Sequence, residues 1–302
     1  MIDLHTHIHT GDYELNKLLP KPYREIIDSK LYKTLTKPAG LIPLSLVQRA
    51  SLIASIYFPE QKLFGFSETV QNLLLKQLLN IINANPLEKL IESMDANGIE
   101  KSAVQVVEPY INTYDALELK KKNNRIYVFG SVKFCRDDYV EQAEAISKEN
   151  IDGFKIHPSL QFLSAGSHKM FEVIEVLPNS LPILIDAGPF LGFRVGTDVF
   201  ELKHLLKEFK DKKFILAHMG KGHYKQTIEI SKKYDNAYLD TSIQPARVIK
   251  KAINEIGAER LFLGSDFPIL GQGMAVKQLE KAAKGREFEL ISELNAKRLL
   301  SK

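Results

Sequence analysis

The chain has 302 residues, of which 44% are hydrophobic and 26% are charged, and its formal net charge is +4. These values are typical of a soluble globular protein and exclude a disordered chain, and so small a net charge does not favour a nucleic-acid partner. The one cysteine, Cys135, excludes an internal disulfide and a cysteine metal cluster, which fits a reducing, cytoplasmic setting. Asp3, His5 and His7 interrupt any apolar run at the start of the chain, so we expect neither a signal peptide nor a membrane span.

Short apolar runs bounded by turn residues recur along the chain, and we interpret each as a buried strand. They are Ile2–His7, Ser102–Glu108, Ile126–Val132, Gly153–His157, Pro182–Ala187, Lys213–His218, Ala237–Ser242 and Leu261–Asp266. From the second run onward, helical patterns alternate with them. The predicted helices are Pro86–Asn97, Asp137–Asn150, His168–Leu177, Asp198–Phe209, Tyr224–Tyr234, Pro245–Ile256, Met274–Lys284 and Phe288–Leu300.

Strands that alternate with helices indicate βαβ units and parallel strand pairing. Eight such units predict an α/β fold, a distorted (β/α)8 TIM barrel that residues 1–302 form as a single domain. The active site of such a barrel lies at the carboxyl ends of its strands. The alternative is an open doubly wound sheet, which the lack of a glycine-rich phosphate loop after the first strand disfavours.

Residues 8–85 do not follow the regular alternation, and a structureless loop of that length is rare in a compact domain. Helical patterns occur within them at Leu15–Leu35, Leu44–Tyr57 and Glu68–Asn83. We therefore predict a helical insertion after the first strand, at the active-site end of the barrel. The charged residues of its first part favour a solvated helix face, and a lid or a dimer contact is the alternative.

Two histidines near the start of the chain favour a metal site. His5 and His7 are two residues apart on the first predicted strand, so their side chains point to the same face. Other strands carry further ionisable side chains at their ends, namely His157, Asp186, His218, Asp240 and Asp266. Such groups would repel one another or be poorly solvated at one barrel mouth without a cation. Nitrogen and oxygen ligands without thiolate suit zinc, and also manganese or iron.

Six short segments form a specific pattern when taken in their order along the chain. They are Ile2–His7, Leu90–Ile99, Gly153–Pro158, Leu216–Gly220, Leu263–Pro268 and Asn295–Leu300. In this order they resemble the amidohydrolase superfamily, specifically its amidohydrolase-2 branch, which includes aminocarboxymuconate-semialdehyde decarboxylase and related decarboxylases and hydrolases. The resemblance implies a metal-dependent TIM-barrel enzyme with one divalent ion.

The resemblance also implies a role for each matching residue. His5 and His7 would be metal ligands. Asp266 would be a ligand, or the base that takes a proton from metal-activated water, and His218 would be the catalytic histidine. The chain departs from the family at Asp186, where a metal-binding histidine is usual. We expect Asp186 to be a ligand too, which would favour a harder ion such as manganese; the alternative is that it does not reach the ion.

Three more residues are candidates for substrate binding. Lys155 and His157 share a face of the fourth strand, where Lys155 would balance the charge of Asp186 or bind a substrate carboxylate. His157 would contact the substrate or support the ligands, and a structural role is its alternative. Arg194 follows the fifth strand and could bind a carboxylate with both guanidinium nitrogens, although a solvated surface position is the default for arginine.

The sequence leaves three functions open. The leading expectation is a hydrolase that uses metal-activated water to attack an amide, ester or lactone carbonyl. The second is a non-oxidative decarboxylase of an aromatic or unsaturated carboxylic acid, and the third is an inactive barrel that acts as a binding protein. In each case the expected partner is a small molecule rather than nucleic acid or membrane. A homodimer is the base-rate expectation for the assembly.

Overall fold

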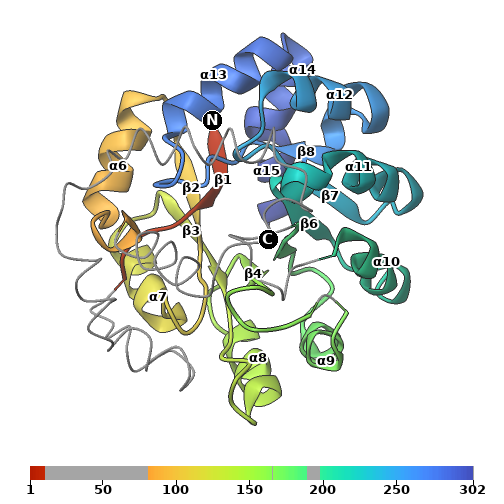
Figure 1. The fold of residues 1–302 in the computed structure, drawn as a ribbon. Helices are drawn as coiled ribbons and strands as arrows, with labels where there is room; N and C mark the ends of the chain where they lie inside the picture. The colour runs from red at the N-terminus through yellow and green to blue at the C-terminus, as the bar shows by residue number, and fades with distance from the viewer. Residues whose placement is uncertain (11–80, 165, 189–197, 302) are drawn as a thin grey trace, which may run out of the picture.

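The computed structural model describes residues 1–10, 81–164, 166–188 and 198–301, which form a parallel eight-stranded sheet with the strands in chain order (Figure 1). The strands are β1 (Ile2–Thr6), β2 (Lys101–Gln105), β3 (Ile126–Gly130), β4 (Gly153–Ile156), β5 (Ile183–Asp186), β6 (Phe214–Ala217), β7 (Ala237–Asp240) and β8 (Leu261–Phe262). Sequential order with parallel pairing throughout is that of a TIM barrel, as predicted, and differs from that of a doubly wound sheet.

Backbone hydrogen bonds between β1 and the segment after β8 close the barrel. Leu4 N donates to Leu263 O at 2.8 Å, and His7 N donates to Phe267 O at 2.6 Å. Asp266 N donates back to His5 O at 2.8 Å. The closure therefore holds the chain segments that carry His5, His7 and Asp266 side by side.

Helices surround this barrel on its outside (Figure 1). They are α6 (Leu87–Ala96), α7 (Thr113–Lys122), α8 (Tyr139–Ser147), α9 (His168–Val176), α10 (Val199–Glu208), α11 (Tyr224–Lys233), α12 (Ala246–Ile256), α13 (Gln272–Ala282), α14 (Arg286–Glu289) and α15 (Asn295–Leu300). The turns η2 (His218–His223) and η3 (Ala258–Arg260) and the π-turn η4 (Leu290–Leu294) complete the described elements. Among these helices, none has both the length and the apolar character needed to cross a bilayer.

Helix α7 was not predicted, because its sequence has little apolar periodicity. It buries only Thr113, Ala116 and Leu117 and ends in three lysines. Its start is fixed instead by Asn112, whose side chain accepts hydrogen bonds from the backbone N–H groups of Tyr114 and Asp115. The predicted helix Phe288–Leu300 is interrupted by the π-turn η4 between α14 and α15. Of the predicted insertion, residues 11–80 lie outside the described part of the chain, so the insertion stays a prediction.

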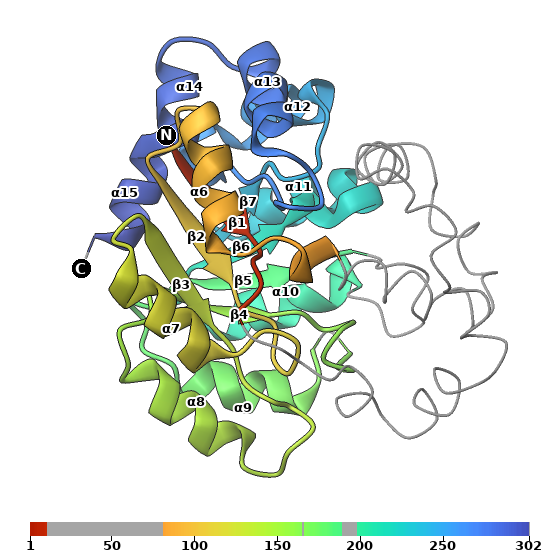
Figure 2. The ribbon, with the colours of Figure 1, turned by 90° about the vertical axis from the view of Figure 1, so that its left-hand side faces the viewer.

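The core has two layers, as expected for a barrel of buried parallel strands. An inner cluster fills the barrel with side chains such as Leu4, Phe129, Leu184, Ile215 and Phe262, and a larger cluster packs the outer faces of the strands against the helices. At the start of β4, a Cβ on Gly153 would lie 2.3 Å from the Phe129 ring, so this position admits only glycine. In side view, α15 and the beginning of β1 mark the amino ends of the strands, opposite their carboxyl ends (Figure 2).

The side chain of Asp3 adds hydrogen bonds to the barrel closure between β1 and the segment after β8. Its fully buried carboxyl accepts from the backbone N–H groups of His5 and Ser265, at 3.2 and 2.9 Å. It also accepts from Ser265 Oγ at 2.6 Å and from Gln272 Nε2 at 2.8 Å. Burial raises the pKa of Asp3 to about 6, although each of these four donors lowers it. Asp3 therefore ties β1 to the segment after β8, although burial disfavours its charged form.

Asp3→Ala should lower the free energy of unfolding by about 2–4 kcal/mol, because it leaves Ser265 and Gln272 with buried, unpaired donors. Asp3→Asn keeps the side-chain volume and one acceptor oxygen, so it should cost clearly less. Urea denaturation followed by circular dichroism measures both values. Equal stability of the Asp3→Ala variant and the unchanged protein would contradict this role in barrel closure.

Candidate active site and metal centre

His5 and His7 lie at the carboxyl end of β1 and direct their Nε2 atoms at Asp266. The distances from these two nitrogens to Asp266 Oδ1 are 3.6 and 3.4 Å. All three side chains are buried, and their candidate ligand atoms lie within 4.8 Å of one another. The structure thus brings together three of the four residues that the sequence predicts as metal ligands.

Hydrogen bonds fix the tautomer of both histidines. His5 Nδ1 lies 2.8 Å from Asp240 Oδ2, and His7 Nδ1 lies 2.9 Å from the backbone oxygen of Gln105. A carboxylate and a carbonyl only accept, so both Nδ1 atoms donate, and Nε2 is the nitrogen of each ring that could bind a metal ion. A metal-binding histidine is usually held in this way by a carboxylate or carbonyl behind it.

His5 Nε2 is the observation that points most directly to a cation. It is buried and has no hydrogen-bond partner among the described residues. Burial and, next, the nearby Lys155 lower the pKa of His5 to about 4, so the ring is neutral at physiological pH. A buried lone pair without a donor is costly, whereas a divalent ion would satisfy it. The donor set of two imidazole nitrogens and one carboxylate suits zinc, manganese or iron.

Asp266 has the charge state that a ligand needs. Burial alone would raise the pKa of its carboxyl group, but the neighbouring His218, His7 and His5 outweigh burial and hold that pKa well below its ordinary value. Its φ angle of 64° is in the left-handed region, which is rare for a residue other than glycine. Strain of this kind collects at functional sites, where the surrounding structure holds it in place.

His218 lies beside this cluster, with its ring stacked on the ring of His5 at a centroid distance of 4.7 Å. Its Nδ1 is 2.7 Å from Ser242 Oγ, and its Nε2 is 3.1 Å from Asp186 Oδ2. Ser242 Oγ also contacts Asp240 Oδ1 closely. A continuous set of contacts therefore joins His5, Asp240, Ser242, His218 and Asp186.

Asp186 ends β5 and is not among the groups of ligand atoms that converge within 4.8 Å in the described part of the chain. Besides His218, its carboxylate contacts Lys221 Nζ at 2.7 Å and His157 Nε2 at 3.4 Å. Burial would raise its pKa, but His157, Lys221 and His218 hold the pKa of Asp186 well below its ordinary value. The predicted role of Asp186 as a metal ligand stays a prediction, and in this structure it faces three donors instead.

The predicted substrate-binding residues differ in their placement. Lys155 is fully buried, and its Nζ has no hydrogen-bond partner in the described part of the chain. Burial lowers the pKa of Lys155, against the attraction of Asp186 and two other carboxylates. His157 is buried beside Asp186, and burial lowers its pKa well below the ordinary value. Arg194 lies outside the described residues.

Asp240, Ser242 and Lys221 had no assigned role in the sequence analysis. Asp240 was expected among the ionisable groups at the strand ends, but its contact with His5 needed the side-chain geometry. Ser242 needed the side-chain geometry, since a serine after a strand is a common turn residue. Lys221 had no motif signal at all, because only the backbone of η2 brings it to Asp186.

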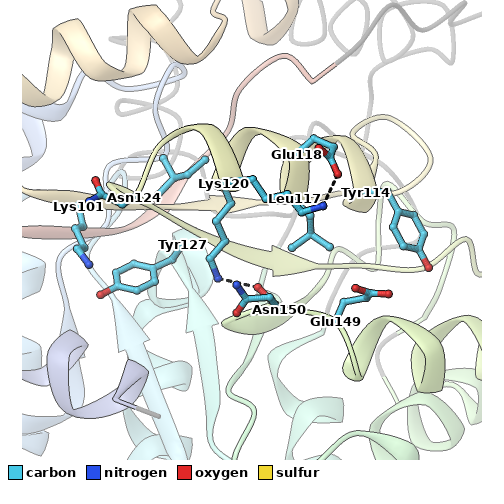
Figure 3. A pocket seen from close by; sticks show the side chains of 11 residues that line it. Lys101, Tyr114, Leu117, Glu118, Lys120, Asn124, Tyr127, Glu149 and Asn150 are labelled. Atoms are coloured by element: carbon cyan, nitrogen blue, oxygen red, sulfur yellow. Dashed lines mark hydrogen bonds and ion pairs between the residues drawn. The ribbon is translucent and has the colours of Figure 1, made fainter.

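A hollow of about 350 Å³ lies elsewhere, beside α7 and the beginnings of β2 and β3 (Figure 3). Lys101, Ile126 and Asn150 line it, which places it toward the amino ends of the strands. Lys120 spans it and donates to Asn150 O at 2.7 Å. The histidines and aspartates of the barrel mouth are not part of this hollow, so it does not belong to the candidate active site.

Comparison with known proteins adds a family match and several structural neighbours. A family model described as Amidohydrolase matches residues 87–302. No curated protein matches the sequence. An uncharacterised TIM-barrel protein from Bordetella bronchiseptica is 15% identical, with a TM-score of 0.66 and with 100% of this chain and 99% of that chain covered.

Two further neighbours are decarboxylases. One is 2,6-dihydroxybenzoate decarboxylase from Rhizobium, at 16% identity and a TM-score of 0.62, covering 99% of this chain and 98% of that chain. The other is a dihydroxybenzoic acid decarboxylase from Polaromonas with bound manganese and the inhibitor 2-nitroresorcinol. It is 17% identical, with a TM-score of 0.59 and with 73% of this chain and 87% of that chain covered. At these identities the likeness shows the fold alone.

Asp240→Asn should weaken metal binding by about 10–100-fold, because the amide can no longer hold His5 as a carboxylate does. Competition with a chelator of known affinity measures this for zinc and for manganese. Asp235→Asn, an exposed change just before β7, is the matched control and should bind as the unchanged protein does. An Asp240→Asn variant with unchanged metal affinity would argue against the support of His5 by Asp240.

Proposed function

The chain belongs to the amidohydrolase family, and on that basis we propose that it is a metal-dependent enzyme that removes carbon dioxide from a small aromatic or unsaturated carboxylic acid without oxidation. The observation that carries the metal dependence is the buried Nε2 of His5, which has no hydrogen-bond partner among the described residues and lies near His7 and Asp266. These three residues would hold one divalent ion. When bound, such an ion would polarise a substrate oxygen and stabilise negative charge that develops on it.

The contacts of His218 favour a proton donor. Burial would raise the pKa of Asp240, but mainly His5 and His218 lower it to about 2, so Asp240 carries no proton. The single hydroxyl proton of Ser242 therefore goes to Asp240, and Ser242 Oγ accepts from His218 Nδ1.

His218 Nε2 then needs a proton of its own to bond Asp186 Oδ2 at 3.1 Å. Both ring nitrogens of His218 therefore face acceptor oxygens, and His218 is the residue that would give a proton to a substrate bound at the barrel mouth.

Decarboxylation needs such a donor. The bond between the ring carbon and the carboxyl carbon breaks, and its electron pair stays on the ring carbon. A proton from His218 then replaces the carboxyl group, and carbon dioxide leaves. Atoms and electrons balance without an oxidant. The decarboxylase neighbours from Rhizobium and Polaromonas support the reaction class, and the manganese in the latter makes manganese as good a candidate as zinc.

Hydrolysis is the second candidate, and the ionised Asp266 is the observation that favours it. A carboxylate beside two histidine ligands could take a proton from an attacking water, as the family name suggests. His218 would then protonate the leaving group. The two reactions differ in whether the proton of His218 goes to a carbon or to a heteroatom.

We expect the manganese- or zinc-loaded protein to release carbon dioxide from one or more members of a panel of hydroxybenzoic acids and unsaturated carboxylic acids. His218→Gln should lower kcat by at least about 100-fold while the metal content stays the same. His204→Gln, on the exposed face of α10, is the matched control and should keep full activity.

Three outcomes would contradict decarboxylation. Turnover of esters, lactones or amides without release of carbon dioxide would establish the hydrolase instead. Full activity in the His218→Gln variant would remove His218 as the proton donor. If the protein binds no metal and turns over none of the acids, esters, lactones or amides, the result would favour the non-catalytic binding protein.

A further inference from the structure

The carboxylate of Asp186 contacts three side chains at the barrel mouth. Its Oδ1 lies 2.7 Å from Lys221 Nζ, and its Oδ2 lies within 3.4 Å of both His218 Nε2 and His157 Nε2. The groups of ligand atoms that converge within 4.8 Å among the described residues do not include Asp186. Asp186 is thus placed as a counterion.

A strained turn brings Lys221 to this position. His218, Met219, Gly220 and Lys221 all have φ angles between 48° and 73°, which costs free energy at each residue other than glycine. The turn packs so closely on the end of β5 that a Cβ on Gly188 would lie 2.2 Å from Gly220 O. A solvent-exposed lysine would need neither the strained backbone of this turn nor its close packing on β5.

The ammonium of Lys221 is also unusually well enclosed for a lysine. The residue is only 9% exposed, and lysine is almost never buried unless it has a partner or a function. Breaking a buried ion pair leaves the other charge uncompensated, so such pairs persist where geometry holds both partners. Here Asp186 contacts both Lys221 and His218.

Two lysines bring amino groups to the barrel mouth. Lys221 Nζ contacts Asp186 Oδ1, and Lys155 Nζ is buried with no hydrogen-bond partner among the described residues. Ammonium groups bind carboxylates through short, charge-assisted hydrogen bonds. An anionic ligand is therefore the kind of ligand that these groups suit.

From these contacts we propose that Lys221, held by its counterion Asp186, is the residue that binds the carboxylate of the substrate, and that Asp186 is not a metal ligand in this chain. Asp186 is accordingly a positioning residue, and Lys221 determines the specificity for an acid over its neutral analogue. This inference rests on the proposed function, since Lys221 would bind the carboxylate group that the reaction removes.

The role of Asp186 is tested by metal content. Elemental analysis of the manganese-loaded Asp186→Asn variant should give the same ratio of metal to chain as the unchanged protein, whereas His7→Ala should lose the metal. Loss of metal in Asp186→Asn, with metal present in the unchanged protein, would overturn the inference alone. Absence of metal in the unchanged protein would overturn the proposed function as well.

The role of Lys221 is tested by binding. Titration calorimetry of the manganese-loaded protein compares 2,6-dihydroxybenzoate with its neutral amide, 2,6-dihydroxybenzamide. Lys221→Met should weaken binding of the acid by about tenfold or more, the effect of losing one hydrogen bond to a charged group, and should leave binding of the amide unchanged. Lys221→Arg should recover part of the loss, and Lys225→Met on the exposed face of α11 should change neither ligand.

The ion pair itself is tested by stability, which also shows whether the variants fold. Asp186→Asn and Lys221→Met each leave one buried charge without its partner, so the double variant should have a Tm loss smaller than the sum of the two single losses. Additive losses, or equal weakening of acid and amide in Lys221→Met, would overturn the pairing.

Discussion

The hydrogen bond between His5 Nδ1 and Asp240 Oδ2, at 2.8 Å, is the contact on which the candidate site depends. It fixes the tautomer of His5 and so aims a lone pair at the space shared with His7 and Asp266. The second oxygen of Asp240 contacts Ser242 Oγ, and Ser242 Oγ in turn contacts His218 Nδ1. Asp240 therefore also helps to position His218. One buried carboxylate thereby orients both the residues suited to a metal ion and the residue suited to proton transfer.

Barrel closure makes this contact geometrically available. His5 is on the first strand and Asp240 on the seventh, far apart in sequence, and they meet because β8 and the segment after it pair with β1. The cost of burying so many ionisable groups is large unless each is paired or binds a cation. His5 Nε2 and Lys155 Nζ are among the buried polar atoms that have no hydrogen-bond partner in the described part of the chain.

Much of the fold could be predicted because parallel strands buried on both faces read as continuous apolar runs between turns. The predicted strand Ile2–His7 and the observed β1 (Ile2–Thr6) differ by one residue, whereas the predicted Leu261–Asp266 runs four residues beyond the observed β8 (Leu261–Phe262). Helix α7 was missed because a side-chain cap and a charged last turn, rather than apolar periodicity, define it. The convergence of His5, His7, His218 and Asp266 could also be expected, since all lie at or just after the carboxyl ends of strands.

The contacts between Lys221, Asp186 and their neighbours could not be predicted from the strand ends. Lys221 reaches Asp186 only through four successive left-handed residues, a conformation that no local sequence signal announces apart from Gly220. The partners of Asp186 likewise depend on side-chain directions across β4, β5 and β6, which a pattern of apolar runs does not contain. Arg194 and most of the predicted insertion lie outside the described residues, so their roles remain predictions.

Anomalous X-ray diffraction from crystals grown with manganese or zinc tests the central claim most directly. The expected result is a single strong anomalous peak within bonding distance of His5 Nε2, His7 Nε2 and the carboxylate of Asp266, with Asp186 still bonded to Lys221. A peak bonded to Asp186 in place of Asp266, or no peak at this end of the barrel in crystals that contain the metal, would contradict it.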